Sequence, residues 1–249
     1  MVSAASTVRS FQLESERWMD DKFPFDLSVQ ANDLSASLYS TAGHGPEILE
    51  AVRRVPGVAG IYGVKTTFLP LDGREVMLEA IDLDASRAMF AARHAEHQDS
   101  QSQESFDAAT RARLASGASV LISENLSALR RLRRGDSIEL PTPAGARRFA
   151  IDGIVEDLSW PAGSLVIDRG VFRDLWHDST TSFIDLRVAP GLEIREAKER
   201  IAAALAGNGT FSSTRSPTSR KSRATRSTLL SRSPTFRCWS PSWSDSWES

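Results

Sequence analysis

The spacing of apolar residues predicts a strand–helix–strand unit near the start of the chain. Residues Asp26–Asn32 alternate apolar and polar side chains, which indicates a half-buried strand. A helix is expected to begin at Gly45–Pro46, because proline is favoured in a first helical turn, and to end at Pro56–Gly57. The run Val58–Leu71 then predicts a long strand. The apolar face of the helix consists of Ile48, Leu49 and Val52.

A second unit of the same kind is expected near the end of the patterned region. Ser182–Val188 alternates like a strand, and Glu193–Leu205 has the apolar spacing of a helix. A final strand should follow, but the next residues lack alternation and include Pro217, so we expect that strand to be missing or very short. We predict that Asp26–Leu71 and Ser182–Gly207 join as one ferredoxin-like lobe.

The residues between the two units predict an insertion that is richer in strands. Asp72–Gly73 has the composition of a hairpin turn, and Glu75–Ile167 is expected to form the β-rich insert. Within it, Glu124–Arg134 predicts a helix, whereas His94–Gln103 is polar and predicts a loop or a helix end. The fold class is therefore α+β. The inward positions expected for the helix are Leu126, Leu129 and Leu132, and the expected strands are Glu75–Leu83, Ala118–Ser123, Ser137–Leu140, Phe149–Glu156 and Ser164–Ile167.

Composition narrows the class of protein without indicating a chemistry. Of the 249 residues, 41% are hydrophobic and 25% are charged, which is the usage of a soluble globular domain. The net charge of −2 argues against a dedicated nucleic-acid binder, and the single cysteine, Cys238, excludes a disulfide framework. No apolar run approaches the roughly 18 to 20 residues that span a bilayer, and the N-terminal residues predict no secretion signal.

The sequence predicts no catalytic, cofactor-binding or metal site. It has no G-x-x-x-x-G-K-[ST] phosphate loop, so ATP hydrolysis by that route is not expected. His94 and His97 lie three positions apart, but they lack a third metal ligand and we interpret them as solvated. His177 is adjacent to Asp178, yet no activated nucleophile accompanies this pair. The remaining motifs have simple structural interpretations. These are strand bulges for Gly57, Gly60 and Gly63, a turn for His44, and a turn for Arg134–Gly135–Asp136.

The order of elements from Val120 onward resembles a known family. A strand ending at Ser123–Glu124 precedes a leucine-rich helix, and Gly135–Asp136 then opens a hairpin. The other matching elements are Leu140–Pro141–Thr142–Pro143 with Gly145, Gly153–Ile154–Val155–Glu156–Asp157, Ile167–Asp168–Arg169 before a helix with Phe and Trp, and Ala189–Pro190–Gly191 before the last helix. Together they resemble the extracytoplasmic domain of FtsX-like ABC transporter permeases, the MacB-like periplasmic core domain. The similarity covers about residues 1–207, because Ser10, Trp18 and Phe23–Leu27 are similar to the segment that follows a membrane helix in such permeases.

This resemblance implies an extracytoplasmic location at the cell membrane and a role in ABC transport. It implies an ABC-type ATPase subunit as partner, a second permease copy, and no nucleic acid. Such domains couple ATPase-driven motion to lipids, lipoproteins, peptides or drugs, and they are not enzymes. The implied organisation is an N-terminal helix in residues 1–25, a core domain in residues 26–207 and a tail in residues 208–249. Both flanking membrane helices of the family are absent, so the chain is expected to be a fragment that does not function alone.

The tail differs from the rest of the chain in composition. Residues 212–249 contain 13 serines, 7 basic and 2 acidic residues, and three of the six tryptophans. Without helical or strand periodicity, such a segment is expected to be disordered. Phe, Cys, Trp and most Ser codons begin with T, and a shifted reading frame moves that T to the codon centre, where it encodes apolar residues. We therefore interpret the tail as a frameshifted version of the next membrane helix.

Two other classes of function stay open from the sequence. A native Ser/Arg-rich tail would suit a soluble nucleic-acid-binding protein, whose affinity would fall steeply with salt and would depend on residues 212–249. An enzyme with an unrecognised site would instead show a deep pocket with perturbed titratable groups.

Overall fold

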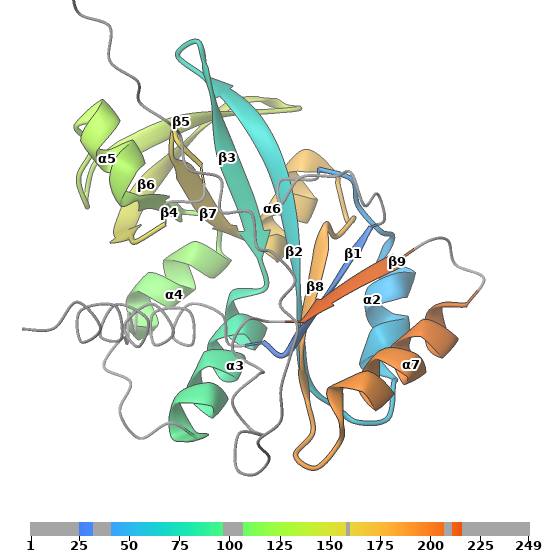
Figure 1. The fold of residues 1–249 in the computed structure, drawn as a ribbon. Helices are drawn as coiled ribbons and strands as arrows, with labels where there is room; N and C mark the ends of the chain where they lie inside the picture. The colour runs from blue at the N-terminus through green and yellow to red at the C-terminus, as the bar shows by residue number, and fades with distance from the viewer. Residues whose placement is uncertain (1–24, 32–40, 97–106, 158–159, 207–210, 216–249) are drawn as a thin grey trace, which may run out of the picture. The chain divides into compact units, whose positions relative to one another are not determined.

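One mixed sheet of nine strands organises the part of the chain that the structure describes (Figure 1). The computed structural model describes residues 25–31, 41–96, 107–157, 160–206 and 211–215. The strand order is β5-β6-β4-β7-β3-β2-β8-β1-β9. The strands are β1 (Leu27–Ala31), β2 (Val58–Leu71), β3 (Arg74–Ile81), β4 (Ser119–Ser123), β5 (Ser137–Thr142), β6 (Gly145–Val155), β7 (Ser164–Asp168), β8 (Phe183–Val188) and β9 (Phe211–Arg215). The helices are α2 (Pro46–Arg53), α3 (Leu83–Glu96), α4 (Ala108–Ala115), α5 (Glu124–Arg130), α6 (Arg169–Trp176) and α7 (Ile194–Leu205).

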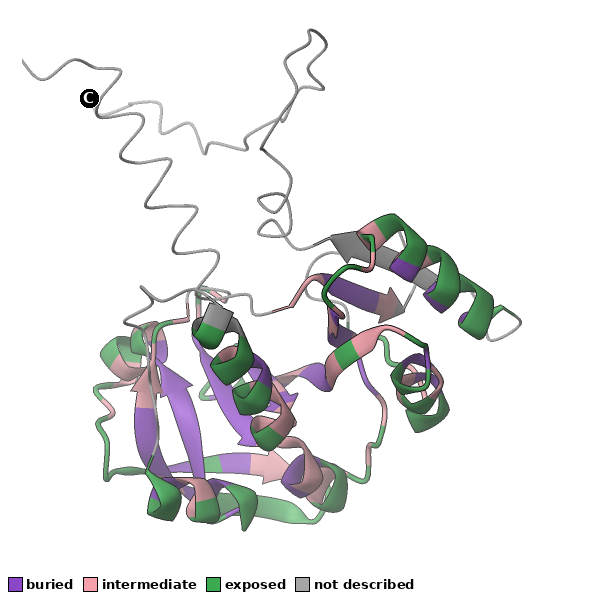
Figure 2. Ribbon diagram, turned by 90° about the horizontal axis from the view of Figure 1, so that it is seen from below, coloured by how far each residue is buried: buried purple, intermediate pink, exposed green. Residues whose placement is uncertain are grey.

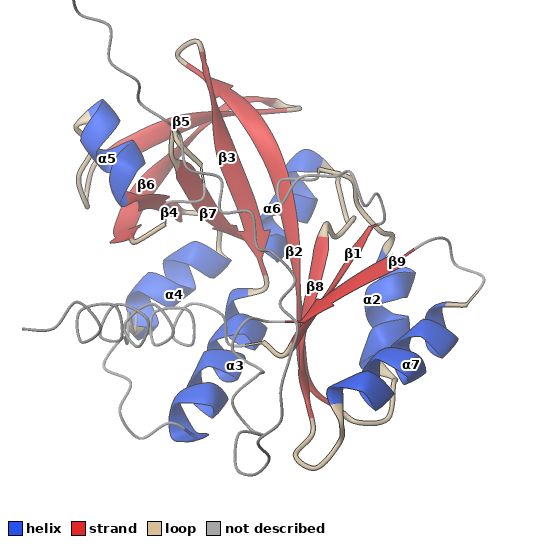
Figure 3. Cartoon of the chain, in the orientation of Figure 1, coloured by secondary structure: helices blue, strands red, loops and turns tan. Residues whose placement is uncertain are grey.

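The two strand–helix units join as one lobe, as the sequence predicts. β1 pairs antiparallel with β8, with Leu27 opposite Leu186, and β8 pairs antiparallel with β2. The lobe therefore has the strand order β2-β8-β1-β9, and α2 and α7 pack together on one face of it (Figure 3). Burial of their apolar faces forms a core. Its fully or nearly fully buried members are Leu27, Val29, Ile48, Val52, Ile184, Leu186, Ala197, Ile201 and Leu205. The ferredoxin-like lobe is confirmed.

The final strand of this lobe corrects the sequence-based expectation. We expected the strand after Leu205 to be missing or very short, but β9 has five residues and pairs antiparallel with β1 along its whole length. Its serines and threonine offer little apolar surface, so the alternation rule could not detect it. Pairing with β1 supplies the backbone hydrogen bonds that the sequence pattern does not reveal.

Strand β2 belongs to both parts of the fold. Its first half pairs with β8, from Val58 to Val64, and its second half pairs with β3, from Val64 to Leu71. Asp72 and Gly73 form the predicted hairpin turn with φ of 48° and 77°, which are the signs that a tight hairpin requires. The β2–β8 register shifts between Val58 and Gly60, which confirms the bulge predicted near Gly60.

The other two glycines of that series are not bulges. Gly57 lies before β2 with a φ of +97°, and Gly63 pairs in register with Ile184. A side chain at Gly63 would collide with the Arg169 guanidinium. Close approach of a neighbouring side chain, and not an extra strand residue, therefore accounts for Gly63.

The insert extends the sheet from the second half of β2, as expected. β3 and β7 are parallel, β7 and β4 are antiparallel, and β4 and β6 are parallel, with β5 at the edge. Its core includes Leu78, Ile122, Phe149, Ile167 and Phe172, all nearly inaccessible to solvent. Figure 2 shows that buried positions gather on the strands, whereas exposed positions gather on the helices. The apolar pattern does not predict α3 and α4. Their large apolar residues are sparse, and much of their sequence is alanine and arginine.

Helix α5 is shorter than predicted, and one of its leucines points outward. It ends at Arg130, because Arg131 adopts a left-handed conformation with φ of +55°. Leu126 is fully buried as expected, but Leu129 is 53% exposed, so its predicted inward position is wrong. Leu132 lies beyond the helix and packs against the insert core. The early end of the helix moves this last leucine off the helical face on which the prediction relied.

Truncating the two leucines of α5 should have very different effects. Leu126→Ala removes a fully buried side chain and should lower the free energy of unfolding by about 2–4 kcal/mol. Leu129→Ala, the matched control, should change it by less than about 0.5 kcal/mol, because that side chain is half exposed. Urea unfolding followed by circular dichroism measures both values. Equal losses would show that the helix face is assigned wrongly.

Three other expectations concern residues outside the described ranges. These are the N-terminal helix expected in residues 1–25, of which the structure describes only Phe25, then His97, and the tail from residue 216 onward. Among the residues that the structure describes, no helix combines the length and apolar content needed to cross a bilayer.

Candidate functional site

The sheet changes partner at Val64, and this point is where the lobe meets the insert. Val64 lies opposite Phe183 of β8 and also opposite Ile81 of β3. Beyond Val64, β8 no longer accompanies β2, because the chain turns away through residues 177–182 toward α6. We call residues 177–182 the return connection, since they carry the chain from the insert back to the lobe.

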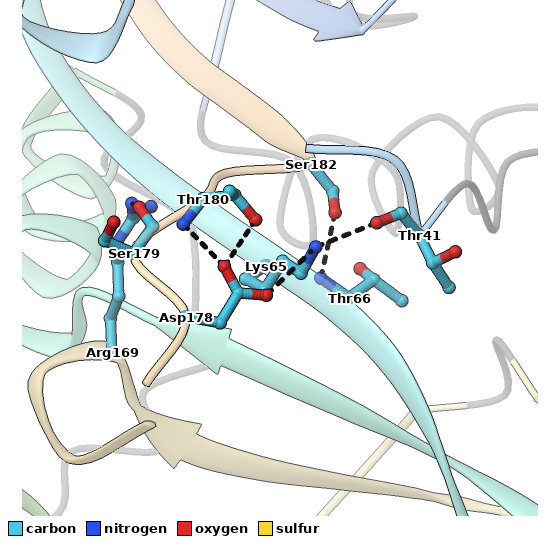
Figure 4. Close-up of polar contacts among 8 residues, drawn as sticks. All are labelled: Thr41, Lys65, Thr66, Arg169, Asp178, Ser179, Thr180 and Ser182. Atoms are coloured by element: carbon cyan, nitrogen blue, oxygen red, sulfur yellow. Dashed lines mark hydrogen bonds and ion pairs between the residues drawn. The ribbon is translucent and has the colours of Figure 1, made fainter. Parts of the chain in front are cut away.

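Lys65 occupies this junction with its ammonium group almost completely buried. Its side chain is 8% exposed, which is rare for a lysine unless it is paired. The Nζ atom donates a hydrogen bond to the Thr41 carbonyl at 2.8 Å and lies 3.4 Å from Asp178 Oδ2 (Figure 4). Lys65 therefore joins β2 to two other segments, the loop before α2 and the return connection.

Asp178 is held in place by its own turn as well as by the lysine. Its Oδ1 accepts hydrogen bonds from the Thr180 backbone N–H at 2.8 Å and from the Thr180 hydroxyl at 2.7 Å. Burial would raise the pKa of Asp178, but the bonds from Thr180 and the charge of Lys65 outweigh it, so the pKa is lowered. The carboxylate therefore stays ionised beside the buried ammonium.

Backbone contacts complete the junction. His44 and Thr181 exchange two backbone hydrogen bonds, each 2.8 Å long, so His44 forms a β-bridge and not the simple turn that we expected. The Thr66 N–H donates to the Ser182 hydroxyl at 3.2 Å (Figure 4). Burial lowers the pKa of His44, which favours the neutral imidazole at this bridge.

Arg169 brings a second cation to the same face of the sheet. It is the first residue of α6, and its Nη2 donates to the Ser179 carbonyl at 3.0 Å. Its guanidinium lies against Gly63, and Nη1 is buried without a hydrogen-bond partner. Burial lowers the pKa of Arg169, while Asp82 and Asp178 act in the opposite direction. The cation is thus held mainly by packing and one backbone acceptor.

The opposite face of the sheet carries one buried acid, Asp185, and one partly buried acid, Glu79. Asp185 of β8 is 7% exposed and accepts hydrogen bonds from Ser28 and Tyr62. Burial raises its pKa to about 6, although both hydrogen bonds act against the shift. Burial also raises the pKa of Glu79 to about 8, with further contributions from the charges of Asp157 and Asp185. At neutral pH, Glu79 is therefore mostly protonated.

This arrangement offers no catalytic chemistry that we can name. Within the described ranges, no group of three or more His, Cys, Asp or Glu residues is placed to hold a metal ion. His94 belongs to α3, and His177 caps α6 in a left-handed conformation while Asp178 bonds Thr180 and Lys65. The Asp136 carboxylate accepts the Arg133 N–H at 2.8 Å, which confirms that Arg134–Gly135–Asp136 forms a turn.

The sequence analysis missed the residues that make this junction. Their signal is a charged residue within an otherwise apolar strand: Lys65 in IYGVKTTF, Glu79 in VMLEAI and Asp185 in FIDL. Buried charges are retained only when other groups satisfy them. Such interruptions therefore mark positions where partners must arrive from elsewhere in the fold.

Comparison with known proteins shows what this chain is similar to in sequence and fold. No family profile matches the chain. An uncharacterised ABC transporter permease protein of Mycobacterium tuberculosis is 26% identical over 213 residues, which cover 83% of this chain. The periplasmic region of MacB from Actinobacillus actinomycetemcomitans superposes with a TM-score of 0.52 and 10% identity, covering 78% of this chain and 92% of that one. The chain is similar in sequence to an ABC transporter permease and has the fold of the MacB periplasmic region.

A further structure has a weaker match to this MacB-like domain. The extracellular domain of the noncanonic ABC-type transporter YknZ from Gram-positive bacteria has a TM-score of 0.48 and 11% identity, covering 76% of this chain and 98% of that one. The MacB-like domain spans only 24% of the length of the mycobacterial permease. The fold of the MacB periplasmic region and the similarity to the mycobacterial permease both support the resemblance stated from the residues.

Proposed function

We propose that this MacB-like domain is the extracytoplasmic part of an ABC transporter permease subunit. In this role it couples the motion that an ABC-type ATPase drives to the export or extraction of a lipid, lipoprotein, peptide or drug. The domain itself performs no catalysis and binds no nucleic acid. A second permease copy would complete the transporter.

One observation carries this proposal. The similarity to the mycobacterial permease extends over 213 residues, so it includes the lobe and the insert together and not a single motif. The fold of the MacB periplasmic region supports the same assignment. The buried Lys65–Asp178 pair and Asp185 are partnered by neighbouring groups of the domain, which suits a structural role better than a reactive one.

We further propose where the functional domain ends. Strand β9 completes the lobe, so the core domain runs from residue 26 to Arg215 and not to residue 207. In this proposal the residues beyond Arg215 are a frameshifted form of the next membrane helix. A permease with its reading frames restored would carry an apolar segment in their place.

Reporter fusions test the location and the reading frame together. The protein is expressed from its own locus with the flanking DNA read in the restored frames, and alkaline phosphatase is inserted at the exposed Pro143–Ala144 turn. Phosphatase is active only outside the cytoplasm, so we expect activity, and a green fluorescent protein at the same turn should stay dark. Fluorescence without phosphatase activity would refute the extracytoplasmic location. Flanking DNA without an apolar run in either alternative frame across residues 212–249 would refute the frameshift.

A further inference from the structure

The lobe and the insert have separate apolar cores on the face that carries Lys65. The lobe core contacts Val58 and Ile61 of β2, whereas the insert core contains Leu69 and Leu71 of the same strand. Between them, the β2 positions on this face are Gly63, Lys65 and Thr67. The contact between the two parts on this face is therefore polar.

We propose that Lys65 and Asp178 form a clasp that holds closed a hinge between the ferredoxin-like lobe and the insert. The clasp comprises this ion pair, its acceptor Thr41 and the Thr180 donors. It fastens the return connection and the loop before α2 onto β2 where the sheet changes partner (Figure 4). The inference concerns the domain itself and does not depend on the transport role.

Two features locate the hinge beneath the clasp. Gly63 has no side chain to pack and is covered by the Arg169 guanidinium. On the opposite face, Tyr62, Val64 and Met89 form a continuous apolar cluster. Opening on the clasp face would leave that cluster packed as the pivot.

The chemistry of the pair allows it to open at low cost. Asp178 is 32% exposed, so water already reaches one partner, whereas Lys65 is 8% exposed. When the return connection moves away, the ion pair is lost, but the buried ammonium regains hydration. Polar contacts of this kind can be replaced by water, whereas separation of an apolar core cannot be compensated in this way. A single apolar core across the junction would have prevented such opening.

Hydrogen exchange of the full 249-residue chain, measured by mass spectrometry, tests the clasp. In Asp178→Asn, the buried ammonium loses its counter-charge, and exchange at residues 178–183 and 43–45 should accelerate roughly ten- to hundredfold. Strand β4, which is wholly buried, reports global unfolding and should exchange as in the wild type. Asp174→Asn, which removes an exposed ion pair with Arg173 on α6, is the matched control and should change neither region.

A second variant separates a clasp from a merely structural pair. Lys65→Met combined with Asp178→Asn removes both charges, so that no unpaired ammonium group stays buried, and it should slow exchange at residues 178–183 relative to Asp178→Asn alone. Spin labels at Glu139→Cys and Glu199→Cys, with Cys238→Ser to remove the sole cysteine, report the distance between insert and lobe. Asp178→Asn should broaden that distance distribution. Unchanged exchange and distances in Asp178→Asn, or equal acceleration in β4 and the return connection, would overturn the proposal.

Discussion

Replacing Gly163 with alanine is expected to destabilise the domain severely, by about 3 kcal/mol or more. Gly163 has a φ of +93°, which disfavours any side chain. An added Cβ would also lie 2.7 Å from Leu126 Cα and 2.8 Å from Leu126 N, and backbone atoms of a capped helix cannot move aside easily. Ser123 caps this helix and also accepts the Ser164 N–H at 2.8 Å, so the region is held from both sides.

Gly135→Ala is the matched control for this effect. Gly135 has the same φ of +93°, but no heavy atom lies within 4 Å of the position that a Cβ would occupy. Its substitution should therefore cost only the conformational penalty, about 1 kcal/mol. Guanidinium unfolding of both variants isolates the contribution of the collision. A Gly163→Ala variant no less stable than Gly135→Ala would show that α5 does not pack so closely on the turn before β7.

Glu79→Gln should raise the stability of the domain at alkaline pH. The folded state holds a proton on Glu79 up to about pH 8, whereas the unfolded chain releases it near the ordinary value of 4.5. Between these values the folded state binds more protons, so the free energy of unfolding falls as pH rises. Glutamine keeps the shape and carries no charge. At pH 8.5 we expect the glutamine variant to be more stable than the wild type by on the order of 2–4 kcal/mol. This value is smaller than the full difference in pKa would give, because structural relaxation and water penetration lower the cost of the buried charge.

The pH dependence distinguishes this effect from a general stabilisation. At pH 4 both states of the wild type are protonated at Glu79, so the two proteins should be nearly equally stable there. The difference should grow from about pH 5 to pH 8. Glu139→Gln, at an exposed position of the edge strand β5, serves as the control. Its free energy of unfolding should depend on pH in the same way as that of the wild type. Denaturation series from pH 4 to 9 measure these curves, and a Glu79→Gln curve parallel to the wild type would contradict the prediction.

Local sequence patterns determined most of the secondary structure. The predicted strand Val58–Leu71 coincides with β2, and the helix starting at Gly45–Pro46 coincides with α2. These elements depend on alternation, proline and turn residues, all of which act within a few positions of the chain. The order of such elements also sufficed for the resemblance to MacB-like domains, because a fold of this kind is a series of local units.

Elements without a strong apolar pattern depended on the tertiary structure. Strand β9 has serine and threonine where a strand prediction looks for alternation, and β1 stabilises it by pairing. Helices α3 and α4 likewise lack a continuous apolar stripe, and the end of α5 depends on a left-handed Arg131 that no residue type required. In each case, contacts with distant segments outweighed the local preference.

The junction between lobe and insert was decided by the tertiary structure alone. The sequence does contain Lys65, Glu79 and Asp185 as charges within apolar strands, but it does not say which groups satisfy them. Thr66 and Ser182, next to the clasp, are 116 positions apart in the chain and come together only because β2 and β8 pair. A buried charge requires partners at fixed distances in space, whereas local patterns specify only neighbours along the chain. The sequence by itself therefore determined most of the elements and the resemblance to MacB-like domains, and the tertiary structure decided which charges meet.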